Sequence, residues 1–207
     1  MKEFKIRCSQ IGKIMSNAKK EGELSAGCVT YLKEWYAEQM FGDREEVKSK
    51  YMDKGNICEV EAIDVCANQF AIFGLKKNEL FLDGEFFCGT PDVITDELII
   101  DTKCSWSGKT FLDAVTSPLD SDYEWQLQGY MYLTATAESR LVYVLLDTPE
   151  MGYISEVIYE NPIEERFYSQ TIKADFAKVE AIIAKVKKCR EWLAEYDKTI
   201  KTKLGMK

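Results

Sequence analysis

The stretch Gly89-Thr90-Pro91-Asp92 is followed, after eight intervening residues, by Asp101-Thr102-Lys103. The apolar residues that lead into the second stretch predict a short strand over 98–104. Because successive side chains of a strand alternate between its faces, Asp101 and Lys103 should point the same way and Thr102 the opposite way. Pro91 disfavours regular ladder pairing, which places Asp92 at a bend where its carboxylate can approach Asp101 across a hairpin. Between them the two carboxylates could hold a divalent metal ion.

These residue types suit the metal-assisted hydrolysis of a phosphodiester. Mg²⁺ takes oxygen ligands and keeps several waters, so one or two carboxylates and the phosphate oxygens of a substrate suffice. A lysine beside the ion can position or deprotonate the attacking water and offset the charge of the phosphate. The chain contains no histidine, which argues against histidine-based triads, zinc sites with two histidines and histidine-metal nucleases.

Two further motifs lie on segments with helical spacing. Glu59 stands four residues after Gly55, and Gln126 and Tyr130 are also four apart. Residues four apart are neighbours on one face of a helix, so Gln126 and Tyr130 should lie side by side.

In this order, Glu59, Asp92, the Asp101-Thr102-Lys103 stretch, Gln126 and Tyr130 resemble the motifs of the PD-(D/E)xK nuclease superfamily. Within it, the sequence is similar to the lambda-exonuclease, YqaJ and RecB-type nucleases with their glutamine-x-x-x-tyrosine element. The resemblance spans roughly residues 55–132. It implies an α/β fold with a restriction-endonuclease-like core, in which helices flank a central mixed β-sheet and a long C-terminal helix follows.

The resemblance also implies a metal site. Asp92, Asp101 and the main-chain carbonyl of Thr102 would be metal ligands, and Glu59 would assist a second metal ion or its waters. The implied ion is Mg²⁺, with Mn²⁺ as a substitute.

Other residues take catalytic or substrate-binding roles by the same resemblance. Lys103 would be the catalytic lysine, with Glu59 as a further catalytic group, and Gln126 would orient the lysine or the scissile phosphate. Tyr130, which is grouped with the substrate-binding residues, would pack against Gln126 and support it rather than take part in the chemistry.

Three residues are candidates for contacts with DNA. The resemblance suggests that Ser9 and Thr90 help to hold a terminal 5′ phosphate, although a serine near the start of a helix is usually a cap. Trp106 follows the strand of the catalytic lysine and could line the substrate channel by stacking on unpaired bases. A buried tryptophan is the simpler interpretation.

Each motif taken alone has a structural explanation. An Asp-x-Lys pair on a strand commonly forms an ion pair or a solvated edge, and Asp92 fits a turn. Glu59 could be a surface acid, and Gln126 and Tyr130 could belong to the edge of a core. The functional hypothesis rests on their conjunction in one order on compatible elements.

Length and composition favour one nuclease domain over residues 1–207. A chain of this length with 46% hydrophobic residues can bury a full core. We found no apolar run long enough to span a membrane and no apolar segment typical of a signal peptide near Met1. We therefore expect no membrane association and a cytoplasmic location in a bacterial host cell.

The seven cysteines include no Cys-x-x-Cys pair, which argues against a disulfide framework and a structural zinc site. Related nucleases with an iron-sulfur cluster carry one cysteine before the core and three after it. Only Cys189 follows the segment of Gln126 here, so we expect no iron-sulfur cluster.

Net charge is the main objection to a DNA-binding function. The formal charge of −8 and the pI near 4.9 argue against tight nonspecific binding to a polyanion. Residues 173–207, however, contain nine Lys and one Arg against five acidic residues. This basic segment either contacts DNA or, as the simpler interpretation, forms the solvated face of a helix.

The remaining expectations concern local structure. We expect helices over 9–15, 27–40, 53–70 and 125–133, with a charged connection over 42–50. We expect strands over 79–93 and 97–104 joined by a turn at Thr95-Asp96, a loop with one short helix over 105–122, a strand pair over 140–147 and 153–159, and helix from 162 onward.

The sequence thus predicts a Mg²⁺-dependent deoxyribonuclease, and specifically a phage-type 5′-to-3′ exonuclease that acts on duplex ends in recombination or end processing. Two alternatives remain open: a restriction or repair endonuclease with the same site, and a noncatalytic DNA-binding or inhibitory protein that keeps the fold. Family analogy raises a single-strand-annealing protein as a partner and a homotrimer as the assembly.

Overall fold

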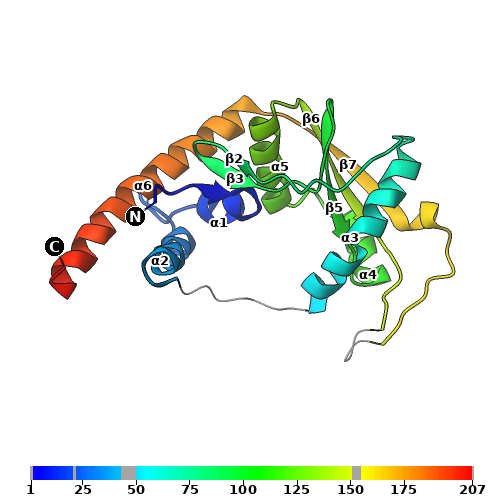
Figure 1. The fold of residues 1–207 in the computed structure, drawn as a ribbon, viewed down its shortest axis with the longest axis horizontal. Coiled ribbons are helices and arrows are strands. Elements are labelled where there is room, and N and C mark those ends of the chain that lie inside the picture. Colours follow the sequence, from blue (N-terminus) through cyan, green and yellow to red (C-terminus); the bar gives the residue numbers. More distant parts are fainter. Residues whose placement is uncertain (1, 21, 43–49, 151–154, 207) are drawn as a thin grey trace.

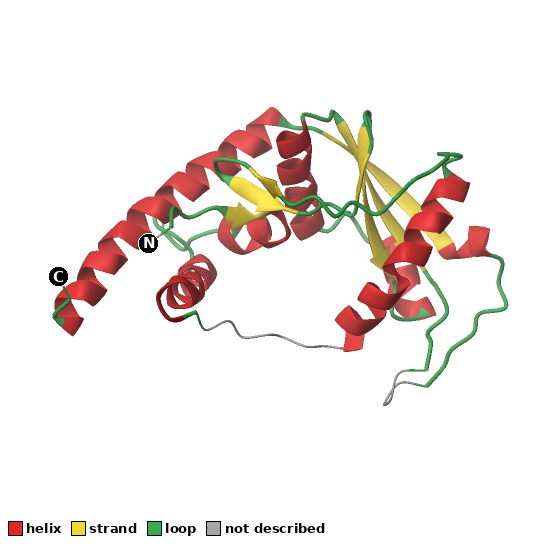
Figure 2. Cartoon of the chain, in the orientation of Figure 1, coloured by secondary structure: helices red, strands yellow, loops and turns green. Residues whose placement is uncertain are grey.

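The computed structural model describes residues 2–20, 22–42, 50–150 and 155–206, and its strands form two sheets (Figures 1 and 2). The first sheet has the order β1-β3-β2 and the second the order β4-β5-β6-β7. The strands are β1 (Ile6–Arg7), β2 (Leu82–Asp83), β3 (Phe87–Gly89), β4 (Val93–Ile94), β5 (Leu98–Cys104), β6 (Glu138–Val144) and β7 (Phe167–Lys173). The helices are η1 (Cys8–Gln10), α1 (Ile11–Met15), α2 (Ala26–Phe41), α3 (Lys50–Gln69), α4 (Gly108–Thr116), α5 (Ser121–Thr134), η2 (Ile163–Arg166) and α6 (Phe176–Leu204).

The four-stranded sheet is mixed, with β5 parallel to β6 and the outer pairs antiparallel. Helix α3 covers one of its faces, and α5 covers the other, where it lies between the sheet and the long α6 (Figure 1). The predicted α/β class, the mixed sheet with flanking helices and the long C-terminal helix are therefore confirmed.

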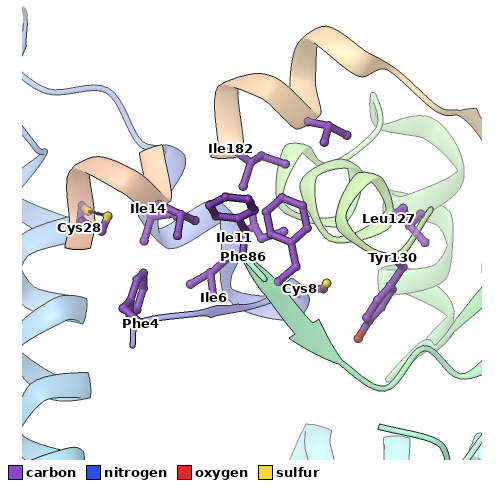
Figure 3. Packing of buried hydrophobic residues seen from close by; sticks show 14 of the residues in the cluster. Phe4, Ile6, Cys8, Ile11, Ile14, Cys28, Phe86, Leu127, Tyr130 and Ile182 are labelled. Carbon is purple, nitrogen blue, oxygen red and sulfur yellow. Dashed lines mark hydrogen bonds between the residues drawn. The ribbon is translucent and has the colours of Figure 1, made fainter. Parts of the chain in front are cut away.

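Alternation along β5 divides its apolar residues between two cores. Ile99 joins the core on the α5 side together with Leu141. That core also takes in Leu127 and residues of α1, α2 and α6 (Figure 3). Ile100 joins the smaller core beneath α3. The central strand is thus fixed from both faces before its polar end begins at Asp101.

Helix α5 packs unusually closely against the N-terminal segment. A Cβ added at Gly129 would lie 2.7 Å from Ile11 Cδ1 and 2.9 Å from Cys8 Sγ. Glycine at this position therefore lets α5 approach η1 and α1, which sets the depth of the helix that carries Gln126.

Helix ends follow local capping chemistry. The Asp120 side chain accepts a hydrogen bond from the N–H of Asp122 at the start of α5. The Asp175 side chain caps α6 in the same way, and Gly205 ends that helix in the left-handed conformation.

Among the helices in the described parts of the chain, none is long and apolar enough to cross a membrane.

The expected single strand over 79–93 is wrong. That segment contains three short strands, of which β2 and β3 belong to the first sheet and only β4 pairs with β5. Gly84 and Pro91 interrupt the pairing, because a glycine at a tight turn and a proline without an N–H both end a ladder. The turn at Thr95-Asp96 is confirmed, with the Thr95 side chain accepting from the N–H of Leu98.

The expected partner of the 140–147 strand is also wrong. β6 pairs with β7, whereas the described part of 153–159 makes only an isolated bridge between Thr148 and Val157. Residues after 162 are therefore not entirely helical, because β7 precedes α6. Residues 43–49 of the expected charged connection and 153–154 lie outside the described residues.

Candidate active site

The candidate site lies where β4 stops covering the edge of β5. β4 pairs with β5 only through Ile99 and Ile100. Beyond these two pairs, the Asp92 carboxylate takes the place of a neighbouring strand. Its Oδ2 accepts from the Thr102 N–H at 2.7 Å and from Thr102 Oγ1 at 2.9 Å. The N–H and C=O of one residue project to the same edge of a strand, so this edge is also the one that the Thr102 carbonyl faces.

Asp101 and Lys103 share the face of β5 that α5 covers, as predicted. Lys103 Nζ lies 2.5 Å from Asp101 Oδ2, and Asp101 is only 1% exposed. Gln126 of α5 donates from Nε2 to Asp101 Oδ1 at 2.8 Å. The amide thus fixes one carboxylate oxygen and leaves the other to the lysine.

Burial and charge act against each other in this pair. Burial raises the pKa of Asp101 to about 6, although the nearby Lys103 ammonium works to lower it. For Lys103, burial works to lower the pKa, but the carboxylates of Asp101 and Asp92 outweigh it and hold that pKa above its usual value. Lys103 is therefore a cation in the metal-free site.

Glu59 approaches the same place from α3. Its Oε2 lies 2.6 Å from Nζ of Lys77, a residue in the irregular segment that follows α3. This hydrogen bond to Glu59 raises the pKa of Lys77. Sequence reasoning missed Lys77, because it belongs to no motif and no regular element.

A pocket of about 460 Å³ connects these groups. Its lining includes Glu59, Asp92, Thr102, Lys103 and Tyr123. Asp101 lies behind Lys103 and is almost wholly buried. Because the pocket sits at a strand edge, side chains from both faces of the sheet can meet there.

Tyr123 is a second residue that sequence reasoning missed. Lys103 Nζ stands 4.9 Å from the centroid of the Tyr123 ring, within the range of a cation–π interaction. Burial raises the pKa of Tyr123, so its hydroxyl stays neutral. Its position three residues before Gln126 on α5 was a usable signal, since residues three apart share a helix face.

Lys54, which precedes the pocket-lining Gly55 on α3, is an unexpected buried lysine. It is 1% exposed, and its Nζ donates to the carbonyls of Leu146 at 3.0 Å and Trp106 at 3.3 Å. Burial lowers the pKa of Lys54. The same nitrogen lies 6.0 Å from the Trp106 ring centroid, so this tryptophan, half-buried, is held against α3.

Tyr130 is buried, and its hydroxyl donates to the Thr90 carbonyl at 3.2 Å. Its ring occupies the space next to Gly89, where an added Cβ would meet Tyr130 Cε1 at 3.0 Å. Gly89 also has φ of +154°. Tyr130 therefore fixes the turn that leads to Asp92.

Ser9 and Thr90 are both exposed, and they lie at the same end of the first sheet because η1 packs against β3. Within the residues that the structure describes, no hydrogen bond joins them. The predicted phosphate site is thus open to solvent but is not pre-formed by a direct contact.

The donors present fit a hard divalent cation. Glu59 and Asp92 supply carboxylates to the pocket. Asp101 Oδ2 is buried and faces the Lys103 ammonium, and among the described residues no group donates a hydrogen bond to it. Mg²⁺ needs only one or two protein carboxylates. In the described parts of the chain, no three acidic or cysteine side chains gather closely enough to form a metal cluster.

The six described cysteines of the core are buried and Cys104 is partly buried, all as free thiols. They are distributed over both cores, and Cys28 lies 3.7 Å from Cys189 between sulfur atoms. Burial raises the pKa of Cys66 to about 12, which keeps this thiol protonated.

Comparison with solved structures gives several matches over nearly the whole chain. A phage-related exonuclease from Haemophilus somnus 129PT has 26% sequence identity and a TM-score of 0.85, over 96% of this chain and 97% of that one. An alkaline exonuclease, LHK-Exo, from Laribacter hongkongensis has 21% identity and a TM-score of 0.72, over 97% and 94%. Its complex with dAMP has 20% identity and a TM-score of 0.74, over 97% and 93%. No family model matches the sequence, and the search of curated proteins gave no match.

Proposed function

We propose that this chain, which has the fold of the lambda-exonuclease type of PD-(D/E)xK nucleases, is a phage-type exonuclease that digests duplex DNA from its ends with the help of a divalent metal ion. One observation carries the proposal: residues from three separate parts of the sequence converge on one pocket at the open edge of β5. The similarity to the phage-related exonuclease extends over the whole chain, which supports the same activity here.

The metal ligands we propose are Asp92, Asp101 and the Thr102 carbonyl, with Glu59 assisting a second ion. A bound Mg²⁺, or Mn²⁺ in its place, would supply an activated water and neutralise charge on the phosphate. Carboxylates and a carbonyl are the donors that such hard cations prefer.

The catalytic work of the chain itself falls to Lys103 and the residues that hold it. Its ammonium, fixed by Asp101 and covered by the Tyr123 ring, faces the pocket and can orient water and offset charge on the phosphate. Gln126 acts through its hydrogen bond to Asp101, which prevents rotation of that carboxylate. Exclusion of bulk water on the α5 side strengthens each of these contacts.

The substrate we propose is a DNA end. The LHK-Exo structure with dAMP contains a deoxynucleoside monophosphate, the kind of product that stepwise digestion releases. Ser9 and Thr90 would hold a terminal 5′ phosphate, Tyr130 would maintain the Thr90 turn, and Trp106 would line the path of the strand. We further propose a single nuclease domain, a cytoplasmic site of action in a bacterial host, a homotrimeric assembly and an annealing protein as partner.

The test uses linear and closed circular duplex DNA in Mg²⁺ and in EDTA, the linear form with and without a 5′ phosphate. Mg²⁺-dependent loss of only the linear DNA, faster with the phosphate, supports an exonuclease with a terminal-phosphate pocket. Cutting of the circle assigns an endonuclease instead. No cleavage of either, with DNA binding retained, assigns a noncatalytic role.

A further inference from the structure

Lys77 is held beside the candidate site by a network around its neighbour Asn78. The Asn78 N–H donates to the Asp92 carbonyl at 2.7 Å, and Asn78 Nδ2 donates to the Pro91 carbonyl at 3.0 Å. The Asn78 side chain also bonds the backbone of Leu80 in both directions. The backbone of Lys77 is therefore tied to the turn that presents Asp92.

The side chain of Lys77 reaches Glu59, a residue that lines the pocket. Its Nζ lies 2.6 Å from Glu59 Oε2, with 43% of the lysine side chain and 21% of the glutamate side chain exposed. Glu59 lines the pocket together with Asp92 and Lys103. Lys77 thus differs from Lys103, whose side chain is only 25% exposed and is paired with a buried acid.

The charges around the pocket explain why a second lysine is needed. Glu59, Asp92 and Asp101 carry three negative charges, and Lys77 and Lys103 carry two positive charges. A divalent cation bound to these acids would compete with the lysines for the same carboxylate oxygens. Lys77 is the more exposed of the two and pairs with Glu59 across a flexible four-carbon chain, so it is the one free to move.

We propose that Lys77 neutralises Glu59 in the metal-free protein and becomes a phosphate-binding cation when a metal ion takes that carboxylate. An ammonium group released beside Glu59, with three donors, is suited to a phosphate oxygen of the incoming strand. The inference rests on the proposed nuclease function, and it adds a specific coupling: one lysine opposes metal binding and favours DNA binding.

Three variants test this coupling. Lys77→Met keeps the length of the chain without its charge, and Lys77→Arg keeps the charge. Lys76→Met removes a neighbouring exposed lysine and serves as the matched control. Lys77 is exposed, so each variant should fold, which circular dichroism and thermal melting verify.

The first measurement is Mn²⁺ binding to the protein alone, by titration calorimetry. Lys77→Met should bind the ion about two- to fivefold more tightly than wild type, the factor expected from the loss of one competing ion pair of this exposure. Lys76→Met should bind as wild type does. Unchanged or weaker binding by Lys77→Met overturns the proposal.

The second measurement is binding to duplex DNA whose terminal linkages are hydrolysis-resistant phosphorothioates, across a salt series. In Mg²⁺, Lys77→Met should bind more weakly, with the slope of log K against log salt smaller by about 0.9, the loss of one phosphate contact. Lys77→Arg should restore the slope, and in EDTA the variants should not differ. A general structural defect would weaken metal and DNA binding together, whereas the proposal requires that Lys77→Met binds the metal ion more tightly and DNA more weakly.

Failure of the proposed function is distinguishable from failure of this inference. If wild type neither binds Mn²⁺ nor degrades linear DNA, the nuclease assignment itself is wrong. If wild type does both and Lys77→Met behaves like Lys76→Met in both measurements, only the role of Lys77 is wrong.

Discussion

The Asp101 carboxylate accepts a hydrogen bond from the Gln126 amide at 2.8 Å, although the two residues lie on different elements, β5 and α5. The helix therefore sets the orientation of an acid that the strand supplies. Several consequences of this arrangement can be measured.

Replacing Lys103 with Met should lower the rate of DNA degradation by about 10²–10⁴-fold, because proton transfer and charge stabilisation by a positioned group contribute factors of this size. DNA binding should remain close to that of wild type. Lys109→Met is the control, since Lys109 is an exposed lysine on α4 that pairs with Asp113. Retained turnover in Lys103→Met would rule out the proposed mechanism.

Asp101 should make stability depend on pH in the metal-free protein. Its pKa in the folded chain is about 6, above the usual value of 3.8, so the folded state binds this proton more tightly than the unfolded state. The stabilisation is complete below pH 4 and is lost as the pH rises through about 6. As the pH rises between these limits, the unfolding free energy of Asp101→Asn should increase relative to that of wild type by about 3 kcal/mol in total.

Urea unfolding in EDTA at pH 4, 5, 6 and 7 checks this expectation. The exchange of the side chain itself adds an offset that does not depend on pH, because asparagine does not titrate. The pH-dependent part alone is the test, and a difference between Asp101→Asn and wild type that does not change with pH contradicts it.

Tyr123→Leu should reduce the catalytic rate, whereas Tyr123→Phe should not. The phenylalanine ring keeps the cation–π contact with Lys103, and leucine loses it. A contact worth about 0.5–2 kcal/mol corresponds to a loss of roughly two- to thirtyfold in kcat with little change in KM. Equal effects of the two substitutions would assign the role to the hydroxyl or to packing instead.

Gly89→Ala should destabilise the fold by about 1–3 kcal/mol. The new methyl would lie 3.0 Å from the Tyr130 ring at a residue whose φ is +154°. Gly55→Ala is the matched control: nothing lies within 4 Å of a Cβ there, and the position is inside α3. That control should gain about 0.5–1 kcal/mol from helix propensity. Thermal or urea unfolding measures both variants. The prediction requires that the unfolding free energy falls for Gly89→Ala and rises for Gly55→Ala.

Local sequence was sufficient to predict the strand that carries Asp101 and Lys103, because a short apolar run that follows a turn is typical of a buried strand. It also placed Glu59 and Gln126 on helices. It did not predict how the 79–93 segment divides between two sheets or that β6 pairs with β7, since pairing partners are chosen by tertiary packing. Lys77 and Lys54 could not be identified from the sequence for the same reason, because their contacts form only between distant parts of the folded chain.

The half of β5 that β4 does not cover also bears on whether copies of the chain aggregate. An exposed strand edge is a template for pairing with another strand and hence for aggregation. Asp92 already occupies the Thr102 N–H, and the charged side chain of Lys103 borders the same edge. The turn of Asp92, which we propose as part of a metal site, therefore also hinders another polypeptide from adding to this edge as a strand.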